Sequence, residues 1–206
     1  MFITGLRGKY IAIEGVIGVG KTTLARLLSQ KYVMPAVLEV VEDNPFLSDF
    51  YKDIDKWGFQ TQLFFLMSRF DQQATVTKAL NQGTGVVSDY TFEKDHLFAG
   101  LILKGRQLRL YEKVYNILSE QVPSPDLVVY LYAPLNILQK RIAARDRPFE
   151  RNMDNNYLAV LIEAYERHFL EDSSSKVLRI DTTEIDFVSE PDDLKSMLDK
   201  IEDALK

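Results

Sequence analysis

The sequence predicts an α/β domain built on an open, doubly wound parallel sheet of about five strands. Short apolar, β-rich segments alternate along the chain with long helical patterns, which is typical of a parallel sheet with helices on both faces. The segment LVVYLYA (127–133) is almost continuously apolar, as strands covered on both faces are. In sheets of this kind, ligands bind at the carboxyl ends of the strands.

Five segments are expected to be strands because they are short, apolar and β-rich. They are YIAIEG (10–15), AVLEVV (36–41), GVVSDY (85–90), LVVYLYA (127–133) and KVLRID (176–181). Between them lie helical patterns at 22–31, 57–80, 108–118, 135–144 and 156–170. No internal repeat, low-complexity linker or domain boundary interrupts this alternation, so we expect residues 1–206 to form one domain.

The chain closes with SEPDDLKSMLDKIEDAL (189–205), whose apolar residues recur at helical spacing. Ser189 is the expected N-cap of this helix, and Pro191 falls in its first turn. The stripe expected to be buried consists of Leu194, Met197, Leu198, Ile201 and Leu205.

Composition restricts the possible functions. The absence of cysteine excludes disulfides and thiolate metal sites, and two histidines argue against a histidine-rich metal centre. A net charge of −5 argues against general nucleic-acid binding, which requires a basic face. No segment reads as a signal peptide or a membrane span, so we expect a cytoplasmic protein without a membrane partner. One basic cluster suggests small phosphorylated ligands: Lys140, Arg141, Arg145, Arg147 and Arg151.

The stretch EGVIGVGKTTLA (14–25) carries the pattern G-x-x-x-x-G-K-[ST] between a predicted strand and a predicted helix. That context argues against a chance glycine-rich turn. Backbone N–H groups and the helix N-terminus can surround a phosphate there, which predicts the P-loop NTPase fold and a site for ATP or GTP. Lys21 would bridge the β- and γ-phosphates, and Thr22 would hold Mg²⁺. The expected contacts are Gly15, Val16, Ile17, Gly18, Val19, Gly20, Lys21, Thr22 and Thr23.

The phosphate acceptor is expected between the second strand and the next helix. In LEVVEDNPF (38–46), a carboxylate at a strand's carboxyl end could take a proton from a substrate hydroxyl, and Glu39, Glu42 and Asp43 are all candidates. In the helix that follows, Gln62, Leu66 and Arg69 share one face, with Phe65 nearby. This pattern suits a pocket for a planar, hydrogen-bonding ring, although a buried helix with polar residues at its edge reads the same way.

Together these two stretches resemble the deoxyribonucleoside kinase family, and the resemblance covers nearly the whole chain. Glu39-Val40-Val41 matches the E-P-V element of the family with its proline replaced. The family tyrosine before a tryptophan falls on Tyr51, and its glutamine and arginine fall on Gln62 and Arg69. The resemblance implies that Glu39 is the base for the 5′-hydroxyl, that Tyr51 binds the 3′-hydroxyl, and that Gln62 and Arg69 bind the nucleobase beside Phe65.

The third predicted strand ends at Asp89, which is suited to holding Mg²⁺ directly or through water. In most of the family an arginine follows this acid and then a serine, where this chain has Tyr90 and Thr91. That departure puts one phosphate contact in question. Bacterial members of the deoxyguanosine kinase type, which also carry a V-E-D-N-P run, are similar at this point. The resemblance further places Asp95 beside Arg69, where a helix N-terminal acid is the simpler alternative.

The basic cluster forms a predicted lid at about 141–151. Arg141 and Arg145 are one helical turn apart and Arg147 follows, so these side chains could close over a triphosphate, although a solvated basic face has the same pattern. The family has R-x-x-x-R-G-R here, and Asp146 replaces the glycine. The resemblance also implies that Glu150 contacts the 3′-hydroxyl and that EIDF (184–187), with Asp186 and Phe187, lies near the adenine of ATP.

We therefore expect an ATP- and Mg²⁺-dependent deoxynucleoside 5′-kinase, with deoxyguanosine as substrate and a homodimer formed through helices. A nucleoside monophosphate kinase would need a basic clamp, but the cations of region 39–69 are only Lys52, Lys56 and Arg69. A non-catalytic nucleotide-binding subunit should have lost Lys21, Glu39 or Asp89, which are all present. A switch GTPase is disfavoured because the chain lacks the guanine-reading pattern N-K-x-D.

Overall fold

In a computed structural model, residues 6–151, 153–172 and 175–206 are described. The expectation that the chain carries no signal peptide includes residues 1–5, which lie outside the described residues. Five parallel strands form one sheet in the order β2-β3-β1-β4-β5. The strands are β1 (Tyr10–Gly15), β2 (Ala36–Val37), β3 (Val86–Ser88), β4 (Leu127–Tyr132) and β5 (Val177–Asp181).

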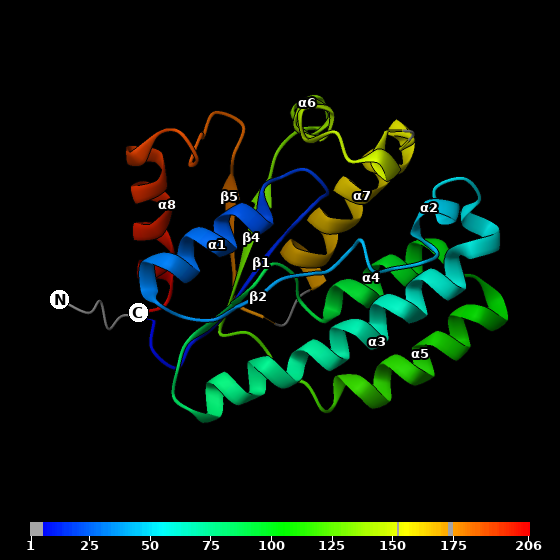
Figure 1. The fold of residues 1–206 in the computed structure, drawn as a ribbon, viewed down its shortest axis with the longest axis horizontal. Helices are drawn as coiled ribbons and strands as arrows, with labels where there is room; N and C mark the ends of the chain where they lie inside the picture. Colours follow the sequence, from blue (N-terminus) through cyan, green and yellow to red (C-terminus); the bar gives the residue numbers. More distant parts are fainter. Residues whose placement is uncertain (1–5, 152, 173–174) are drawn as a thin grey trace.

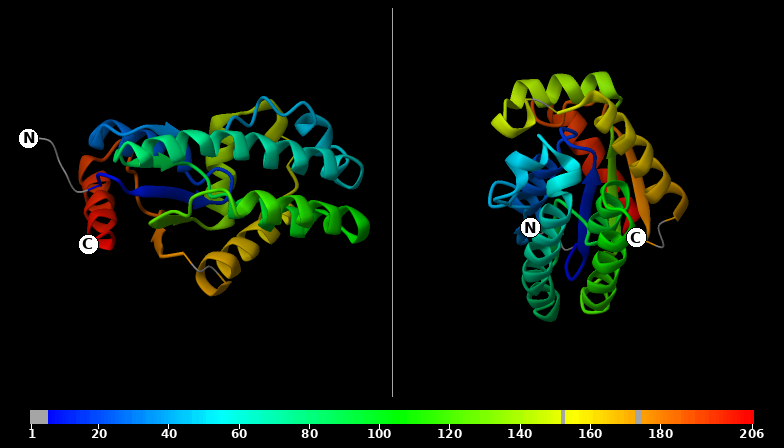
Figure 2. Two further views of the ribbon diagram at one scale, coloured as in Figure 1. Left: turned by 90° about the horizontal axis from the view of Figure 1, so that it is seen from below. Right: turned by 90° about the vertical axis from the view of Figure 1, so that its right-hand side faces the viewer.

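The helices occupy the intervals between the strands (Figure 1). They are α1 (Lys21–Tyr32), α2 (Leu47–Phe50), α3 (Ile54–Asn81), α4 (Glu93–Ile102), α5 (Gly105–Ser119), α6 (Leu135–Arg145), α7 (Asn155–Arg167) and α8 (Pro191–Ala204), with a 3₁₀ turn at Pro148–Glu150 and a π turn at His168–Asp172. Figure 2 shows α1 and α3 on one side of β1, and α5 and α7 on the other. The predicted doubly wound α/β fold is therefore confirmed.

The central strands are buried because helices cover both of their faces. Every residue of β1 is buried, and Ile11 and Ile13 pack with Leu24 of α1 and Leu131 of β4 in the main core. A second core lies beyond the sheet, where α2, α3, α4 and α5 pack around residues such as Leu66. This helical extension carries one wall of the site described below. Within the described residues, no helix combines the length and apolar character needed to cross a bilayer.

The second strand is shorter than predicted. Only Ala36 and Val37 pair with β3, whereas 38–41 leave the sheet and line a cavity. The side chain of Asp89 holds this departing segment by accepting a hydrogen bond from the Glu39 backbone N–H at 2.7 Å. The β-rich pattern of 36–41 therefore covers two structures: sheet pairing at 36–37 and the cavity lining at 38–41.

Two helix starts illustrate local control of the fold. Asp53 caps α3, because its side chain accepts a hydrogen bond from the Lys56 backbone N–H at 3.1 Å. The predicted cap of the last helix is wrong: Glu190 holds the N-cap position of α8, and Pro191 begins the helix. Ser189 instead donates its backbone N–H to Asp186 at 3.0 Å, so it belongs to the preceding turn.

Candidate active site

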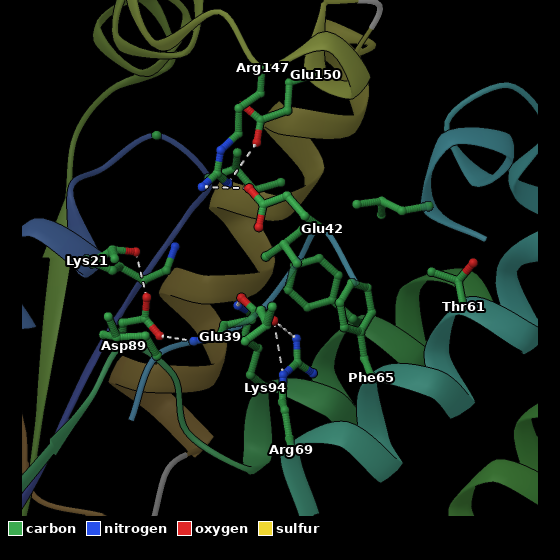
Figure 3. Close-up of a pocket in the computed structure, with 18 of the residues that line it drawn as sticks. Lys21, Glu39, Glu42, Thr61, Phe65, Arg69, Asp89, Lys94, Arg147 and Glu150 are labelled. Atoms are coloured by element: carbon green, nitrogen blue, oxygen red, sulfur yellow. Dashed lines mark hydrogen bonds and ion pairs between the residues drawn. The ribbon is translucent and has the colours of Figure 1, made fainter. Parts of the chain in front are cut away.

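A cavity of about 490 Å³ opens beside the phosphate loop (Figure 3). Its walls come from the start of α1, the segment after β2, α2, the first half of α3, the start of α4, and the segment that follows α6. Residues expected at the phosphates and residues expected at the acceptor meet here, although they come from parts of the chain more than a hundred residues apart. They are Lys21, Thr22, Glu39, Tyr51, Gln62, Phe65, Arg69, Asp89, Arg145, Arg147 and Glu150.

The phosphate loop has the backbone conformation that its glycines permit. Gly18 and Gly20 have φ of 88° and 107°, in the region that favours glycine. The Lys21 ammonium lies within the loop and donates to the carbonyls of Gly15 at 2.7 Å and Val16 at 3.3 Å. Burial, reinforced by the positive charge of Lys94, lowers the pKa of Lys21 to about 8. A bound polyphosphate would favour the charged form of this lysine.

Two oxygen groups next to Lys21 have the chemistry of a magnesium site. The Thr22 hydroxyl donates to Asp89 Oδ2 at 2.5 Å, and Asp89 lies directly after β3. Within the described part of the chain there is no cluster of three or more His, Cys, Asp or Glu side chains that could hold a metal. A hydroxyl and a single carboxylate nevertheless fit Mg²⁺, which usually takes its other ligands from substrate phosphates and water.

Glu39 is the best-placed of the three candidate bases. Its carboxylate is largely buried in the cavity between two cations, Arg69 and Lys94. Lys94 Nζ lies 2.8 Å from Glu39 Oε2, and Arg69 donates to Oε1. Burial alone would raise the pKa of Glu39, but these two cations outweigh it and hold the pKa far below its usual range. The carboxylate is therefore ionised at neutral pH.

The other two candidate acids are placed differently. Glu42 is exposed at the cavity rim, where it forms an ion pair with Arg147 at 3.2 Å. Asp43 is exposed and does not line the cavity. The geometry thus ranks Glu39 first without reference to any family.

Gln62, Phe65 and Arg69 project from α3 toward one end of the cavity, as their spacing predicts. The Arg69 guanidinium lies 5.0 Å from the Phe65 ring centroid and 5.6 Å from that of Tyr90. It also forms an ion pair with Asp95, which is fully buried and does not line the cavity. Burial raises the pKa of Asp95 to about 7, against the effect of Arg69. Asp95 therefore acts on the cavity through Arg69.

Tyr90, which replaces the family arginine, does not line the cavity either. It is fully buried, and its hydroxyl donates to Gln72 Oε1 at 2.5 Å. Thr91 has a clear structural task, because its backbone N–H and hydroxyl both donate to the buried carboxylate of Glu14, at 2.6 and 3.0 Å. Glu14 precedes the phosphate loop, so this contact ties the loop to the end of β3.

The predicted lid is joined internally and to the acceptor side by ion pairs. Arg145 donates to both carboxylate oxygens of Glu150, at 2.6 and 2.5 Å. Arg147 pairs with Glu42, and Figure 3 shows this contact spanning the mouth of the cavity. Asp146 has φ of 51°, the conformation that suits the family glycine, and its carboxylate accepts two hydrogen bonds from Arg151. The replacement therefore keeps the shape of the lid.

Arg141 does not join Arg145 and Arg147 at this cavity. Its guanidinium donates to the Thr182 hydroxyl at 2.9 Å and to the Thr182 carbonyl at 2.7 Å, beyond the end of β5. There it lines a second cavity of about 590 Å³ on the other side of the phosphate loop. The expectation that Arg141 meets the phosphates beside Arg145 is not supported by this geometry. The second cavity is also lined by Gly18, Val19, Gly20, Thr23, Asp186 and Phe187.

Sequence reasoning missed several cavity residues, of which Lys94 is the most buried cation. Lys94 escaped notice because an isolated lysine forms no motif, although it follows Tyr90 by four residues. Thr61 and Tyr157 also line the cavity. Tyr157 lies near Tyr51, whose pKa is raised by burial and then by the neighbouring Tyr157 and Glu150. Tyr51 and Glu150, the pair expected at the sugar, therefore lie in one part of the cavity.

Comparisons with known proteins agree with this geometry. The family model described as deoxynucleoside kinase matches residues 11–206. The chain is 39% identical over 201 residues to a deoxyguanosine kinase of Bacillus subtilis, covering 95% of this chain and 97% of that protein. It is 30% identical over 203 residues to a deoxyadenosine/deoxycytidine kinase of the same organism, covering 95% and 92%.

A solved structure shares the fold. The deoxyadenosine kinase from M. mycoides, determined with dCMP and dCDP bound, superposes with a TM-score of 0.82 at 24% sequence identity, covering 94% of this chain and 99% of that one. With the family match over nearly the whole sequence, the resemblance noted from the motifs is confirmed: this chain belongs to the deoxynucleoside kinase family.

Proposed function

We propose that this deoxynucleoside kinase transfers the γ-phosphoryl group of ATP to the 5′-hydroxyl of a purine deoxynucleoside, with deoxyguanosine as the preferred substrate. The observation that carries the proposal is one cavity that holds the ionised Glu39 carboxylate between the phosphate-loop Lys21 and the ring-binding side chain Arg69. A nucleoside 5′-hydroxyl bound at Glu39 would have the triphosphate of ATP on one side and the nucleobase of the same nucleoside on the other.

The proposed reaction uses Glu39 as the base. The proton of the 5′-hydroxyl moves to Glu39, the 5′-oxygen forms a bond to the γ-phosphorus, and the bond between that phosphorus and ADP breaks. Lys21 and Arg145 stabilise the negative charge on the transferring group. Thr22 and Asp89 would hold Mg²⁺, which neutralises phosphate charge when bound. Tyr51 and Glu150 orient the sugar.

A neutral acceptor fits the charges of the cavity better than a monophosphate. Three of the four arginines that line the cavity already have a carboxylate partner: Arg69 with Glu39 and Asp95, Arg145 with Glu150, and Arg147 with Glu42. The fourth, Arg26, is exposed on α1. A monophosphate that bound one of the three paired arginines would displace a carboxylate and leave it unpaired, which is costly in a desolvated pocket. This supports a nucleoside kinase over a nucleoside monophosphate kinase.

The polar groups at the ring end of the cavity favour guanine. Arg69 can only donate hydrogen bonds, and guanine presents the acceptors O6 and N7 on one edge, where adenine presents an N6 donor. Asp95 could accept from that donor, but it is fully buried behind Arg69. The relatives do not separate the two bases, since a Dictyostelium discoideum deoxyadenosine kinase is also 39% identical over 200 residues.

A substrate panel tests this proposal. ATP-dependent phosphorylation is measured on the four natural deoxynucleosides, their monophosphates, and 7-deazadeoxyguanosine, which lacks the N7 acceptor. We expect deoxyguanosine to have the highest kcat/KM and the 7-deaza analogue to lose about 10-fold or more. Turnover of monophosphates alone would overturn the nucleoside kinase assignment. A preference for deoxyadenosine would overturn the guanine preference and mean that an acceptor, such as the Gln62 amide oxygen or Asp95, reads the adenine amino group.

We also propose a homodimer through α3 and α5. These helices pack against each other outside the sheet, and they leave large apolar side chains exposed, namely Met67 on α3 and Leu110 and Ile117 on α5. Covering such a surface is a common reason for self-association. Light scattering should give twice the mass of the 23.7 kDa chain, and Ile117→Lys should shift it to the monomer.

A further inference from the structure

Lys94 is a buried cation that the proposed reaction does not yet use. Its side chain is only 7% exposed, and its ammonium lies 2.8 Å from Glu39 Oε2. Among the described residues, Glu39 is the one carboxylate with which Lys94 forms an ion pair. Burying a lysine is unfavourable unless its charge is used or compensated, so this placement calls for an explanation.

Position 90 supplies part of that explanation, because this chain has Tyr90 where most of the family has an arginine. Tyr90 ends the turn after β3 with a buried ring, and it brings no positive charge to the cavity. Lys94 lies four residues later in the first turn of α4, where its backbone N–H is close to the Thr91 hydroxyl at 3.3 Å. The chain thus brings a cation to this end of the cavity from the helix instead of from the strand end.

Arg69 and Lys94 bind different oxygens of Glu39 and have different second partners. Arg69 donates to Oε1 and is also bound to Asp95, and it lies at the ring end of the cavity. Lys94 binds Oε2 alone and lies near enough to the phosphate loop that its charge lowers the pKa of Lys21. When a nucleobase binds Arg69, Glu39 Oε1 becomes free for the 5′-hydroxyl, while Oε2 stays bound to Lys94.

We propose, resting on the proposed function, that Lys94 is the positioning residue of the catalytic base. Its ammonium pairs with the Glu39 carboxylate and fixes Oε2, so that Oε1 faces the 5′-hydroxyl once the nucleobase engages Arg69. It takes over the charge that Tyr90 cannot supply. The proton transfer itself stays between the substrate and Glu39.

Substitutions that separate charge from size test this role. Lys94→Met keeps the length of the side chain and removes its charge, and Lys94→Arg keeps the charge. The matched control is Lys104→Met, which makes the same change at an exposed position just beyond α4. We expect Lys94→Met to lower kcat by about 10- to 100-fold, Lys94→Arg to recover most of that loss, and the control to behave as wild type.

The split between kcat and KM distinguishes positioning from packing. A residue that fixes Glu39 for the chemical step changes kcat, so in Lys94→Met the KM values for the nucleoside and for ATP should stay within about twofold of wild type. A loss of packing around Lys94 would disturb the cavity wall and change the nucleoside KM as well.

The outcomes are separable. A lower kcat in Lys94→Met at nearly unchanged KM, restored by Lys94→Arg, supports the positioning role. A matching change in the nucleoside KM would reduce Lys94 to a packing role, and so would equal losses in the two variants. If Lys94→Met does not fold, Lys94→Gln replaces it. Glu39→Gln is the reference: if it keeps normal turnover, the proposed base fails, whereas an inactive Glu39→Gln with a normal kcat in Lys94→Met overturns only the present inference.

Discussion

The two cavities beside the phosphate loop have different kinds of walls. On the acceptor side, charged side chains such as Glu39, Arg69 and Glu150 meet in buried or half-buried pairs. On the other side, Arg141 and the segment that carries Phe187 face the phosphate loop at Gly18 and Gly20, whose φ values favour glycine. The first cavity depends on paired charged side chains, whereas the second also depends on the backbone conformation of the loop, so different substitutions should disturb them.

The largest effect is expected from Glu39→Gln, which keeps the shape of the acceptor side and removes the proposed proton acceptor. We expect kcat to fall by at least about 100-fold, while ATP binding, for which we propose the phosphate loop and the second cavity, stays within about twofold in a calorimetric titration. Asp43→Asn is the control, because Asp43 is exposed on the same segment and does not line the cavity. Normal turnover in Glu39→Gln would contradict the assignment of the base.

The converse test is Gly20→Ala on the nucleotide side. Gly20 has φ of 107°, and an added Cβ would lie 2.9 Å from Phe187 Cζ. Strain of about 1–3 kcal/mol should raise the KM for ATP by about 10-fold or more and leave the nucleoside KM nearly unchanged.

Gly100→Ala is the matched control for this change, because Gly100 is exposed on α4 and a Cβ there meets nothing within 4 Å. A larger change in the nucleoside KM than in the ATP KM would show that the two sides are not separable in this way.

The pH dependence of ATP binding should sharpen the contrast. The pKa of Lys21 is lowered to about 8 by burial and by Lys94, and its charged form is the one that binds phosphate. As pH rises above 8 the free enzyme loses this proton, so the Kd of ATP should increase by at most about 10-fold per pH unit. Titrations at pH 7, 8 and 9 measure this slope. Lys21→Arg should flatten it, because arginine stays charged.

The smallest effect is expected at Asp146, which lies in the predicted lid and lines neither cavity. Asp146→Gly removes the left-handed strain and also the contacts with Arg151, so the opposing effects should leave Tm within about 2 °C of wild type. Asp146→Ala keeps the strain and loses the contacts, and its Tm should fall by about 2–4 °C. Differential scanning calorimetry distinguishes these cases, and equal Tm values for the two variants would argue against strain at this position.

Local patterns predicted most of the fold because each long element carries its own periodicity. They failed for α2, which has only four residues, and for α4, in which Lys94 and Asp95 are buried and obscure the apolar stripe. They also overextended β2, since a segment that lines a buried cavity is as apolar as a strand.

Residues of the cavity that belong to sequence motifs were predicted. Residues whose partners are distant in the sequence were missed. Glu39 and Lys94 are 55 residues apart, and no spacing rule links them. Arg141 and Arg145 share a helical face, yet their long side chains reach Thr182 and Glu150 in opposite directions. For such residues the partner has to be known before the role can be assigned.

Asp89 has a consequence for how the two substrates influence each other. One of its oxygens accepts from Thr22 in the phosphate loop and the other from the backbone of Glu39. If ATP and Mg²⁺ bind at Asp89 as proposed, any reorientation of this carboxylate would also move the segment that carries Glu39. Linkage makes the effect reciprocal: the factor by which ATP changes nucleoside affinity equals the factor by which the nucleoside changes ATP affinity. A single side chain thus gives the enzyme a means of synergy between donor and acceptor.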